Sequence, residues 1–163
     1  MEYLYRKGHR SIAGIFKSDD VQGLQRYEGY VDTLRNLRLP LEDAQVFWYN
    51  TENKNHILQM DGGWPAVERT LSGCTAVVCY NDEIASRLII NLHKQGVRIP
   101  QDMAVVSFDN SQYCEICPVG ITSLSHSHDN VGKMAAELLI RRLRGEECTS
   151  ETAFWTLVER ESS

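Results

Sequence analysis

The 163-residue chain lacks any long hydrophobic run, and its first residues, 1–8, lack the apolar core of a signal peptide. No apolar stretch approaches the roughly 18 residues that a transmembrane helix needs, so the sequence predicts no membrane span. Cysteines are odd in number and show no secreted disulfide framework; they stand at positions 74, 79, 114, 117 and 148. We therefore expect a reducing, cytoplasmic environment.

The chain also lacks a metal-binding pattern and an excess of positive charge. The pair Cys114 and Cys117 has no second ligand pair at zinc spacing and does not open a helix, so two packing thiols are favoured over metal or redox chemistry. Seventeen basic residues against 22 acidic ones give a net charge of −5, which argues against this surface binding nucleic acid. The short basic cluster at 141–144 is expected to be a solvated helix end.

Glycine-rich and nucleophile motifs are missing as well. No G-x-G-x-x-G follows a strand, no G-x-x-x-x-G-K-[ST] exists, and there is no G-x-S-x-G elbow. An enzyme would have to use its carboxylates alone, for example as a metal-assisted hydrolase or a sugar isomerase. We expect no catalysis, no cofactor and no metal ion.

The chain does contain three short apolar runs, at 12–16, 76–79 and 103–106, that each end in a polar cluster. The clusters are Lys17-Ser18-Asp19-Asp20, Tyr80-Asn81-Asp82-Glu83 and Ser107-Phe108-Asp109-Asn110. A buried strand, a polar tip and a following helix form the α/β unit, and the carboxyl ends of such strands line the ligand crevice. Tips rich in Asp and Asn, with an arginine nearby, favour an uncharged hydroxyl-bearing ligand such as a sugar over a phosphate.

Hydrophobic periodicity predicts one domain in which strands alternate with helices. Strands are expected near 11–17, 44–49, 75–80, 103–107, 121–125 and 154–158. Helices are expected near 1–7, from the first polar tip to Pro40, at 52–71 with a break at 62–65, at 82–95 and at 129–144. Predicted inward stripes are Leu24, Tyr27, Val31, Leu34 and Leu37, then Ile84, Leu88 and Leu92, and finally Val131, Ala135, Leu138 and Leu139. The predicted fold is α/β, a mostly parallel sheet with helices on both faces.

Three polar residues are the strongest candidates for contacting a ligand. Asp109, at a strand tip, can accept hydrogen bonds from two adjacent sugar hydroxyls, although it could instead only form a turn. Asn81 offers both a donor and an acceptor, and its alternative role is a helix N-cap. Arg26 lies in the second turn of the helix after the first tip, where it either reaches the crevice or stays solvated.

Five further residues are weaker candidates. Asp20 and Gln22 share the rim after the first strand, where a carboxylate can also serve merely as a cap. Lys17 either points into the site or pairs with a neighbouring carboxylate. Tyr49 either stacks on a sugar face or fills the core. His126 either binds ligand, lies at a hinge or is a plain surface histidine.

Five stretches in the same order resemble the effector-binding domain of the LacI/GalR bacterial repressors. They are Gly8-His9-Arg10-Ser11-Ile12-Ala13; Arg26-x-x-Gly29-Tyr30; Thr75-Ala76-Val77-Val78-Cys79-Tyr80-Asn81-Asp82-Glu83-Ile84-Ala85; Gly96-Val97-Arg98-Ile99-Pro100-Gln101-Asp102 with Val105-Val106-Ser107-Phe108-Asp109; and Ile121-Thr122-Ser123-Leu124. Residues 14–23 resemble the arabinose repressor branch, in which a GntR-type winged-helix head is joined to a LacI-type sugar domain.

The resemblance implies a fold like that of the type I periplasmic sugar-binding proteins, two α/β lobes with the ligand between them. Residues 1–163 would correspond mainly to the C-terminal lobe, with the DNA-binding head and the first part of the N-terminal lobe absent. Family ligand positions fall on Gln22, Arg26, Asn81, Asp109 and His126, and Tyr49 matches an aromatic that packs on the ligand. One departure is that the family usually has Gly at Ser107 and Asp at Asn110.

We therefore predict a sugar-sensing regulatory domain of a cytoplasmic bacterial repressor. The expected partners are a sugar effector, L-arabinose first, operator DNA through a head domain, and a second copy in a homodimer; no membrane is involved. Two alternatives remain open. One is a transport-associated sugar-binding protein, which would have the same fold. The other is a carboxylate-based sugar enzyme, which would use the same polar residues at the strand tips.

Overall fold

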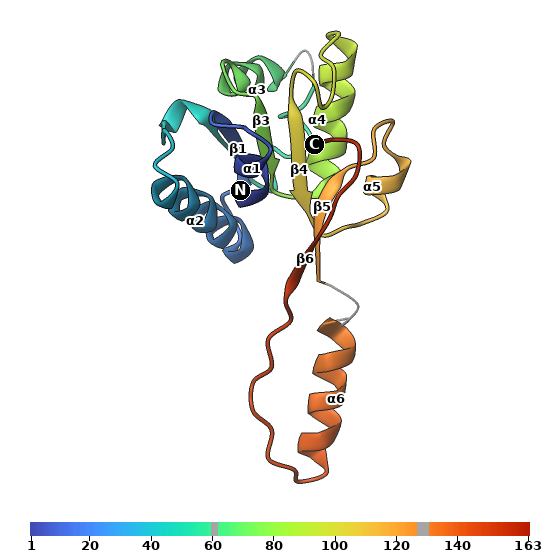
Figure 1. Ribbon diagram of the computed structural model, residues 1–163. Coiled ribbons are helices and arrows are strands. Elements are labelled where there is room, and N and C mark those ends of the chain that lie inside the picture. Colours follow the sequence, from blue (N-terminus) through green and yellow to red (C-terminus); the bar gives the residue numbers. More distant parts are fainter. Residues whose placement is uncertain (60–61, 127–130) are drawn as a thin grey trace.

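The computed structural model describes residues 1–59, 62–126 and 131–163 and contains a six-stranded sheet (Figure 1). The strand order is β2-β1-β3-β4-β5-β6, with every neighbouring pair parallel except β5 and β6. The strands are β1 Ile12–Lys17, β2 Val46–Tyr49, β3 Ala76–Cys79, β4 Ala104–Phe108, β5 Thr122–His126 and β6 Trp155–Val158. The predicted mostly parallel sheet is confirmed.

Helices cover both faces of this sheet (Figure 1). The helices are α1 Glu2–Arg6, α2 Val21–Asn36, the 3-10 turn η1 Asp43–Gln45, α3 Trp64–Leu71, α4 Asp82–Lys94, α5 Tyr113–Ile116 and α6 Val131–Leu143. One core lies under α1 and α2, where Leu4, Tyr30 and Leu34 pack around Phe16. The other core lies under α3, α4 and α5 and includes the predicted stripe of α4. The central strands β1, β3 and β4 are therefore buried on both sides, which explains their continuous apolar runs.

Side-chain caps start the helices that follow the first two tips. Asp20 accepts a hydrogen bond from the Gly23 N–H at 2.6 Å, and Asn81 accepts one from the Ile84 N–H at 3.1 Å. Each cap satisfies a backbone donor that has no partner inside its helix. The caps fix the residue at which each helix begins after its strand, and so they keep the polar tips along one edge of the sheet.

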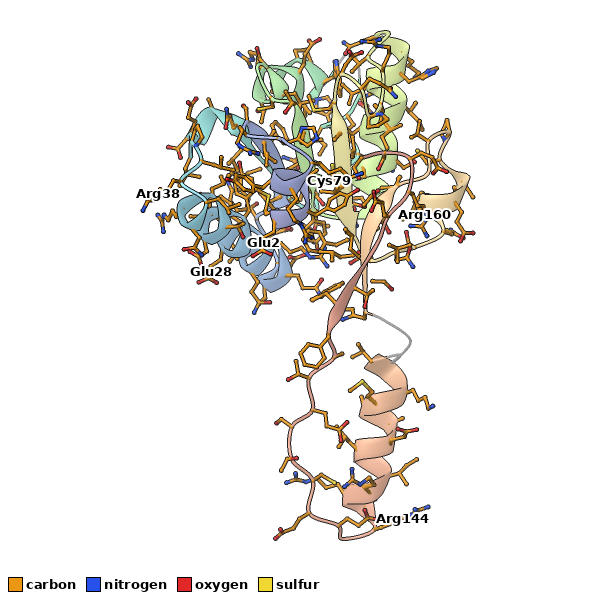
Figure 2. All side chains as sticks on the ribbon, viewed as in Figure 1. Glu2, Glu28, Arg38, Cys79, Arg144 and Arg160 are labelled. Atoms are coloured by element: carbon orange, nitrogen blue, oxygen red, sulfur yellow. The ribbon has the colours of Figure 1, made fainter. Side chains whose placement is uncertain are left out.

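The predicted burial of α6 is wrong. None of its described residues is buried, and Leu139 is 61% exposed. The helix leaves the sheet between β5 and β6 and projects away from both cores, with Arg144 beyond its far end (Figure 1, Figure 2). An apolar stripe is buried only where another element covers it, and among the described residues no helix or strand buries this one, although Cys148 contacts Leu138 from the segment that follows.

Two other local expectations are also corrected. Residues 51–58 form turns, and α3 begins only at Trp64, where Pro65 suits the first helical turn. On α2, Leu24 is 53% exposed, whereas Tyr30, outside the predicted stripe, is buried. Among the described residues, no helix is both long enough and apolar enough to cross a membrane.

Candidate functional site

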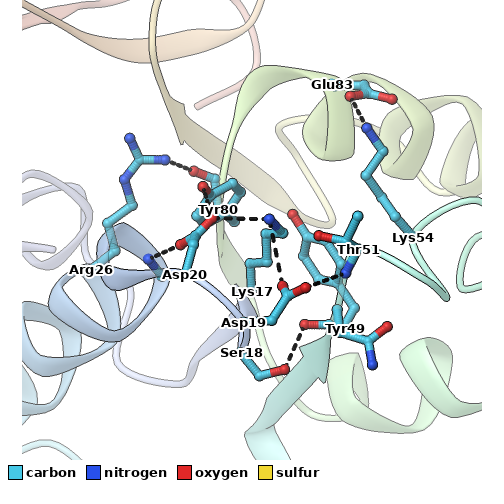
Figure 3. A network of polar contacts seen from close by, with 12 residues as sticks. Lys17, Ser18, Asp19, Asp20, Arg26, Tyr49, Thr51, Lys54, Tyr80 and Glu83 are labelled. Atoms are coloured by element: carbon cyan, nitrogen blue, oxygen red, sulfur yellow. Dashed lines mark hydrogen bonds and ion pairs between the residues drawn. The ribbon is translucent and has the colours of Figure 1, made fainter.

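Arg26 joins the tips of two neighbouring strands at the carboxyl edge of the sheet. Its Nη2 donates to Asp109 Oδ1 at 2.8 Å, and its Nη1 donates to the carbonyl oxygen of Tyr80 (the latter contact is drawn in Figure 3). Asn81 follows Tyr80 directly. The structure thus brings Arg26, Asn81 and Asp109 to one edge, as the sequence predicts.

Aromatic rings hold the Arg26 side chain in place. Its guanidinium carbon lies 4.7 Å from the ring centre of Tyr80 and 4.5 Å from that of Phe108. Cations are attracted to the faces of such rings. The Arg26 side chain is only 8% exposed, whereas that of its partner Asp109 is 42% exposed. The solvated reading of Arg26 therefore does not hold, and Asp109 keeps surface that a ligand can reach.

The backbone at Asp109 adopts an unusual conformation. Asp109 has φ +98° and Asn110 has φ +47°, both in the region that L-residues other than Gly, Asn and Asp rarely adopt. The Asp109 N–H donates to the carbonyl oxygen of Leu124 on β5 at 2.9 Å. Asp109 is thus a turn residue as well as a candidate ligand contact. The turn involves its backbone, and its side chain remains available to a ligand.

Asp20 is committed to contacts within the protein (Figure 3). It accepts from the Gly23 N–H, from the Tyr80 hydroxyl at 2.6 Å and from Lys17 Nζ at 3.1 Å. Partial burial by itself raises the pKa of Asp20, but the hydrogen bonds from Tyr80, Gly23 and Lys17 outweigh it and leave the pKa below its ordinary value. Burial and the bond to Asp20 raise the pKa of Tyr80 to about 12. Asp20 acts as a cap, and Lys17 pairs with neighbouring carboxylates.

Asn81 is both a cap and a free donor. Its side-chain oxygen caps α4, while its amide nitrogen has no hydrogen-bond partner among the described residues. Asn81 is partly exposed, so this amide can still donate to a ligand. The two readings of Asn81 therefore apply to different atoms of one side chain.

Tyr49 does not present a face for stacking. It is 1% exposed, belongs to the core beneath α3 and α4, and meets Tyr80 edge to face at 6.0 Å between ring centres. The core-filling reading is the one that the structure supports, because the tip of β2 is closed over by neighbouring side chains. The Tyr49 hydroxyl is buried and has no partner among the described residues.

Gln22 and His126 lie along a groove of about 850 Å³ that also includes Arg26. Gln22 is exposed in the first turn of α2, and His126 is exposed at the end of β5. The His126 ring lies against Trp155 of β6, with 3.5 Å between ring centres. Arg26 lines this groove and also contacts Asp109, so the groove adjoins the sheet edge that carries Asp109.

The sequence did not lead us to four residues that surround the candidate site. The rings of Tyr80 and Phe108 both lie against the Arg26 guanidinium, Trp155 packs on His126, and Asp82 is a buried acceptor beside the Asp109 turn. Tyr80, Asp82 and Phe108 stand inside the polar clusters read from the sequence, and that position is the signal that could have identified them. Within the described ranges, no three His, Cys, Asp or Glu side chains gather as a metal site would require.

The fold is periplasmic-binding-protein-like, with a mostly parallel α/β sheet. Residues 1–163 match the model of the periplasmic binding protein-like domain over their whole length, and the chain belongs to that family. This confirms the predicted fold class.

The chain is similar in sequence and fold to parts of several transcriptional regulators. It is 35% identical over 150 residues to the arabinose metabolism transcriptional repressor of Geobacillus stearothermophilus, with 87% of this chain and 39% of the relative covered. A solved complex of the transcriptional regulator CelR with cellobiose is 28% identical, with a TM-score of 0.79 over 99% of this chain and 49% of the other. A periplasmic binding protein/LacI transcriptional regulator from Alkaliphilus metalliredigens, complexed with D-xylulofuranose, is 26% identical with a TM-score of 0.77, covering 99% and 60%.

The expected resemblance to LacI-type effector domains, with an arabinose repressor among the relatives, is confirmed. These relatives are transcriptional regulators rather than enzymes, in agreement with the expectation of no catalysis. The chain spans about two fifths of the length of the curated repressor that it matches.

Proposed function

We propose that this chain is the sugar-sensing lobe of a bacterial transcriptional repressor whose effector is L-arabinose. The full-length protein would bind operator DNA through a separate head, act as a homodimer in the cytoplasm, and hold the sugar between this lobe and a second one. The observation that carries the proposal is the convergence of Arg26, Asn81 and Asp109 at the carboxyl edge of the sheet. The identity to an arabinose repressor favours the pentose.

The chemistry of this edge suits a polyol. Asp109 is exposed enough to accept from sugar hydroxyls, and hydrogen bonds to charged groups contribute about 1.5–3 kcal/mol each. Arg26 is already oriented by two rings, so little side-chain freedom remains to be lost on binding. At this edge Lys17 is paired with Asp19 and Asp20, and Arg26 with Asp109, so both cations are already matched by carboxylates, which disfavours a phosphate ligand.

Sugar binding would reach the DNA through the arrangement of the two lobes. A ligand held between lobes favours the closed arrangement by as much as its affinities for the open and closed states differ. Coupling energies of this kind are typically about 1–3 kcal/mol, a change of roughly 5- to 150-fold in DNA affinity. The uncovered apolar side chains of α6 fit this arrangement, since a second lobe would give them a partner.

The test is a calorimetric titration of the full-length protein with L-arabinose, D-xylose, D-galactose and nucleosides, paired with operator release. We expect L-arabinose to bind and to release DNA. Asp109→Asn should weaken binding by roughly 10- to 100-fold, because it removes the charge from a hydrogen bond worth about 1.5–3 kcal/mol.

Asp102→Asn is the matched control. Asp102 also forms an ion pair, with Arg98 at 2.6 Å, but it lies before β4 at the opposite edge of the sheet. The control should bind sugar like the unmodified protein. Normal DNA release by the Asp109→Asn protein would contradict the site, and conversion of the sugar to a product would favour the enzyme alternative.

A further inference from the structure

Asp82 is a buried charge that the proposed sugar contacts do not use. It is 1% exposed and is the first residue of α4, next to the cap Asn81. A carboxylate is costly to bury unless several donors surround it. Its environment therefore bears on what Asp82 does.

Three donors from different segments meet at this carboxylate. The Ser107 hydroxyl of β4 and the Ser123 hydroxyl of β5 both donate to Oδ1, the latter at 2.7 Å. The Ser111 N–H donates to Oδ2 at 2.6 Å. The positive end of α4 also favours an acidic group at this position. Asp82 thus links α4, β4, β5 and the turn after β4.

The same carboxylate holds the turn that carries Asp109. The Ser111 N–H binds Asp82 directly, while the Asn110 N–H donates at 3.0 Å to the Ser123 hydroxyl, which itself donates to Asp82. The Asp109 N–H is held by Leu124 O at 2.9 Å. The backbone N–H groups of residues 109, 110 and 111 are therefore all bound. Asp82 binds that of Ser111 directly and that of Asn110 through the Ser123 hydroxyl.

This anchoring coincides with the strained part of the backbone. Asn110 has φ +47°, which asparagine tolerates, but Asp109 has φ +98°, beyond the usual left-handed region, and a non-glycine residue keeps such a φ only where the surroundings impose it. With this backbone conformation, Asp109 Oδ1 lies 2.8 Å from Arg26 Nη2 and accepts a hydrogen bond from it. We infer that Asp82 is a positioning residue for the sugar site: it holds the 109–111 turn so that Asp109 faces Arg26 and the ligand.

This inference rests on the proposed function, and the first experiment measures L-arabinose affinity of the full-length protein. Asp82→Asn preserves size but places an amide among three donors, so we expect the Kd to rise at least tenfold while the protein stays folded. Ser123→Ala removes one donor to Asp82 together with the acceptor of the Asn110 N–H, but leaves the Ser111 N–H bound to Asp82, and should produce a smaller rise. In an Asp109→Asn background, Asp82→Asn should change the Kd less than twofold, because its effect acts through Asp109.

A matched control separates positioning from general loss of stability. Asn91 lies on the same helix, is 5% exposed and donates to Leu58 O at 2.6 Å. Asn91→Ala should lower the Tm without changing the Kd more than twofold. An unchanged Kd in Asp82→Asn would overturn the inference, and so would an equal rise with and without Asp109.

A second measurement does not depend on the sugar. Hydrogen exchange of the backbone amides of residues 110 and 111, without ligand, should accelerate at least tenfold in Asp82→Asn and stay unchanged in Asn91→Ala. If no sugar binds the unmodified protein, the proposed function fails, while accelerated exchange still supports the role of Asp82 in holding the turn. Unchanged exchange would refute that role by itself.

Discussion

Replacing Arg26 by lysine tests whether the guanidinium itself organises the edge of the sheet. The arginine guanidinium is planar and carries several donors, so here it contacts Tyr80 O and Asp109 at once while also lying against the rings of Tyr80 and Phe108. A lysine ammonium keeps the positive charge, but its three N–H donors all leave one nitrogen and cannot reproduce the planar fork that spans both acceptors. Lysine can therefore retain one of the two acceptors and lacks the flat surface for both rings.

The expected loss follows from these contacts. One hydrogen bond involving a charged group contributes about 1.5–3 kcal/mol, and weaker packing on the rings adds about 0.5–1 kcal/mol. Because the new ammonium regains some hydration, we expect the free energy of unfolding to fall by about 2–3 kcal/mol. For a protein of this size that corresponds to a decrease in Tm of roughly 4–12 °C.

Urea unfolding followed by circular dichroism measures this effect, with Arg98→Lys as the control. Arg98 pairs with Asp102 at 2.6 Å, but its side chain is 71% exposed, so its replacement should leave the free energy of unfolding nearly unchanged. A loss in Arg26→Lys no larger than that in the control would refute the view that Arg26 is a fixed part of the site.

Two further predictions concern the residues around Arg26. Tyr49→Phe removes a buried hydroxyl that has no hydrogen-bond partner among the described residues. The free energy of unfolding, measured in urea, should therefore rise by about 1 kcal/mol. A decrease of similar size would show that the Tyr49 hydroxyl does have a partner. The pKa of Asp20 lies below its ordinary value of 3.8, so the unfolded chain binds more protons in this range. The resulting stabilisation is present above pH 3.8 and is lost as the pH falls through the lowered pKa. Between pH 5 and pH 2 the free energy of unfolding should therefore fall less in Asp20→Asn than in the unmodified protein. The same fall in both proteins would refute this account.

The strands and their polar tips were predictable because the signals are local. A run such as 76–79 must be buried on both faces, and the Asn81 that follows it can cap only the helix that comes next. Parallel strands then place their carboxyl ends together. For this reason Arg26, Asn81 and Asp109 could be assigned to one edge before any contact was known.

Other features could not be predicted because they depend on what lies opposite a side chain. The stripe of α6 has the same period as that of α4, but only α4 has a sheet beneath it. Tyr49 and Trp155 are both aromatic and both lie at strand ends, yet one is 1% and the other 41% exposed. Periodicity identifies an apolar face and says nothing about its partner.

The sequence by itself determined the α/β class, the polar edge and the family, because each rests on the order and spacing of residues along the chain. Only the tertiary structure decided which atom of each polar residue is already used. Asp20 is taken up by capping, Asn81 keeps a free amide, Arg26 contacts two rings and two acceptors, and Asp82 binds the turn of Asp109. The physical reason is that a hydrogen bond depends on short distances between segments far apart in the sequence, and folding alone sets those distances.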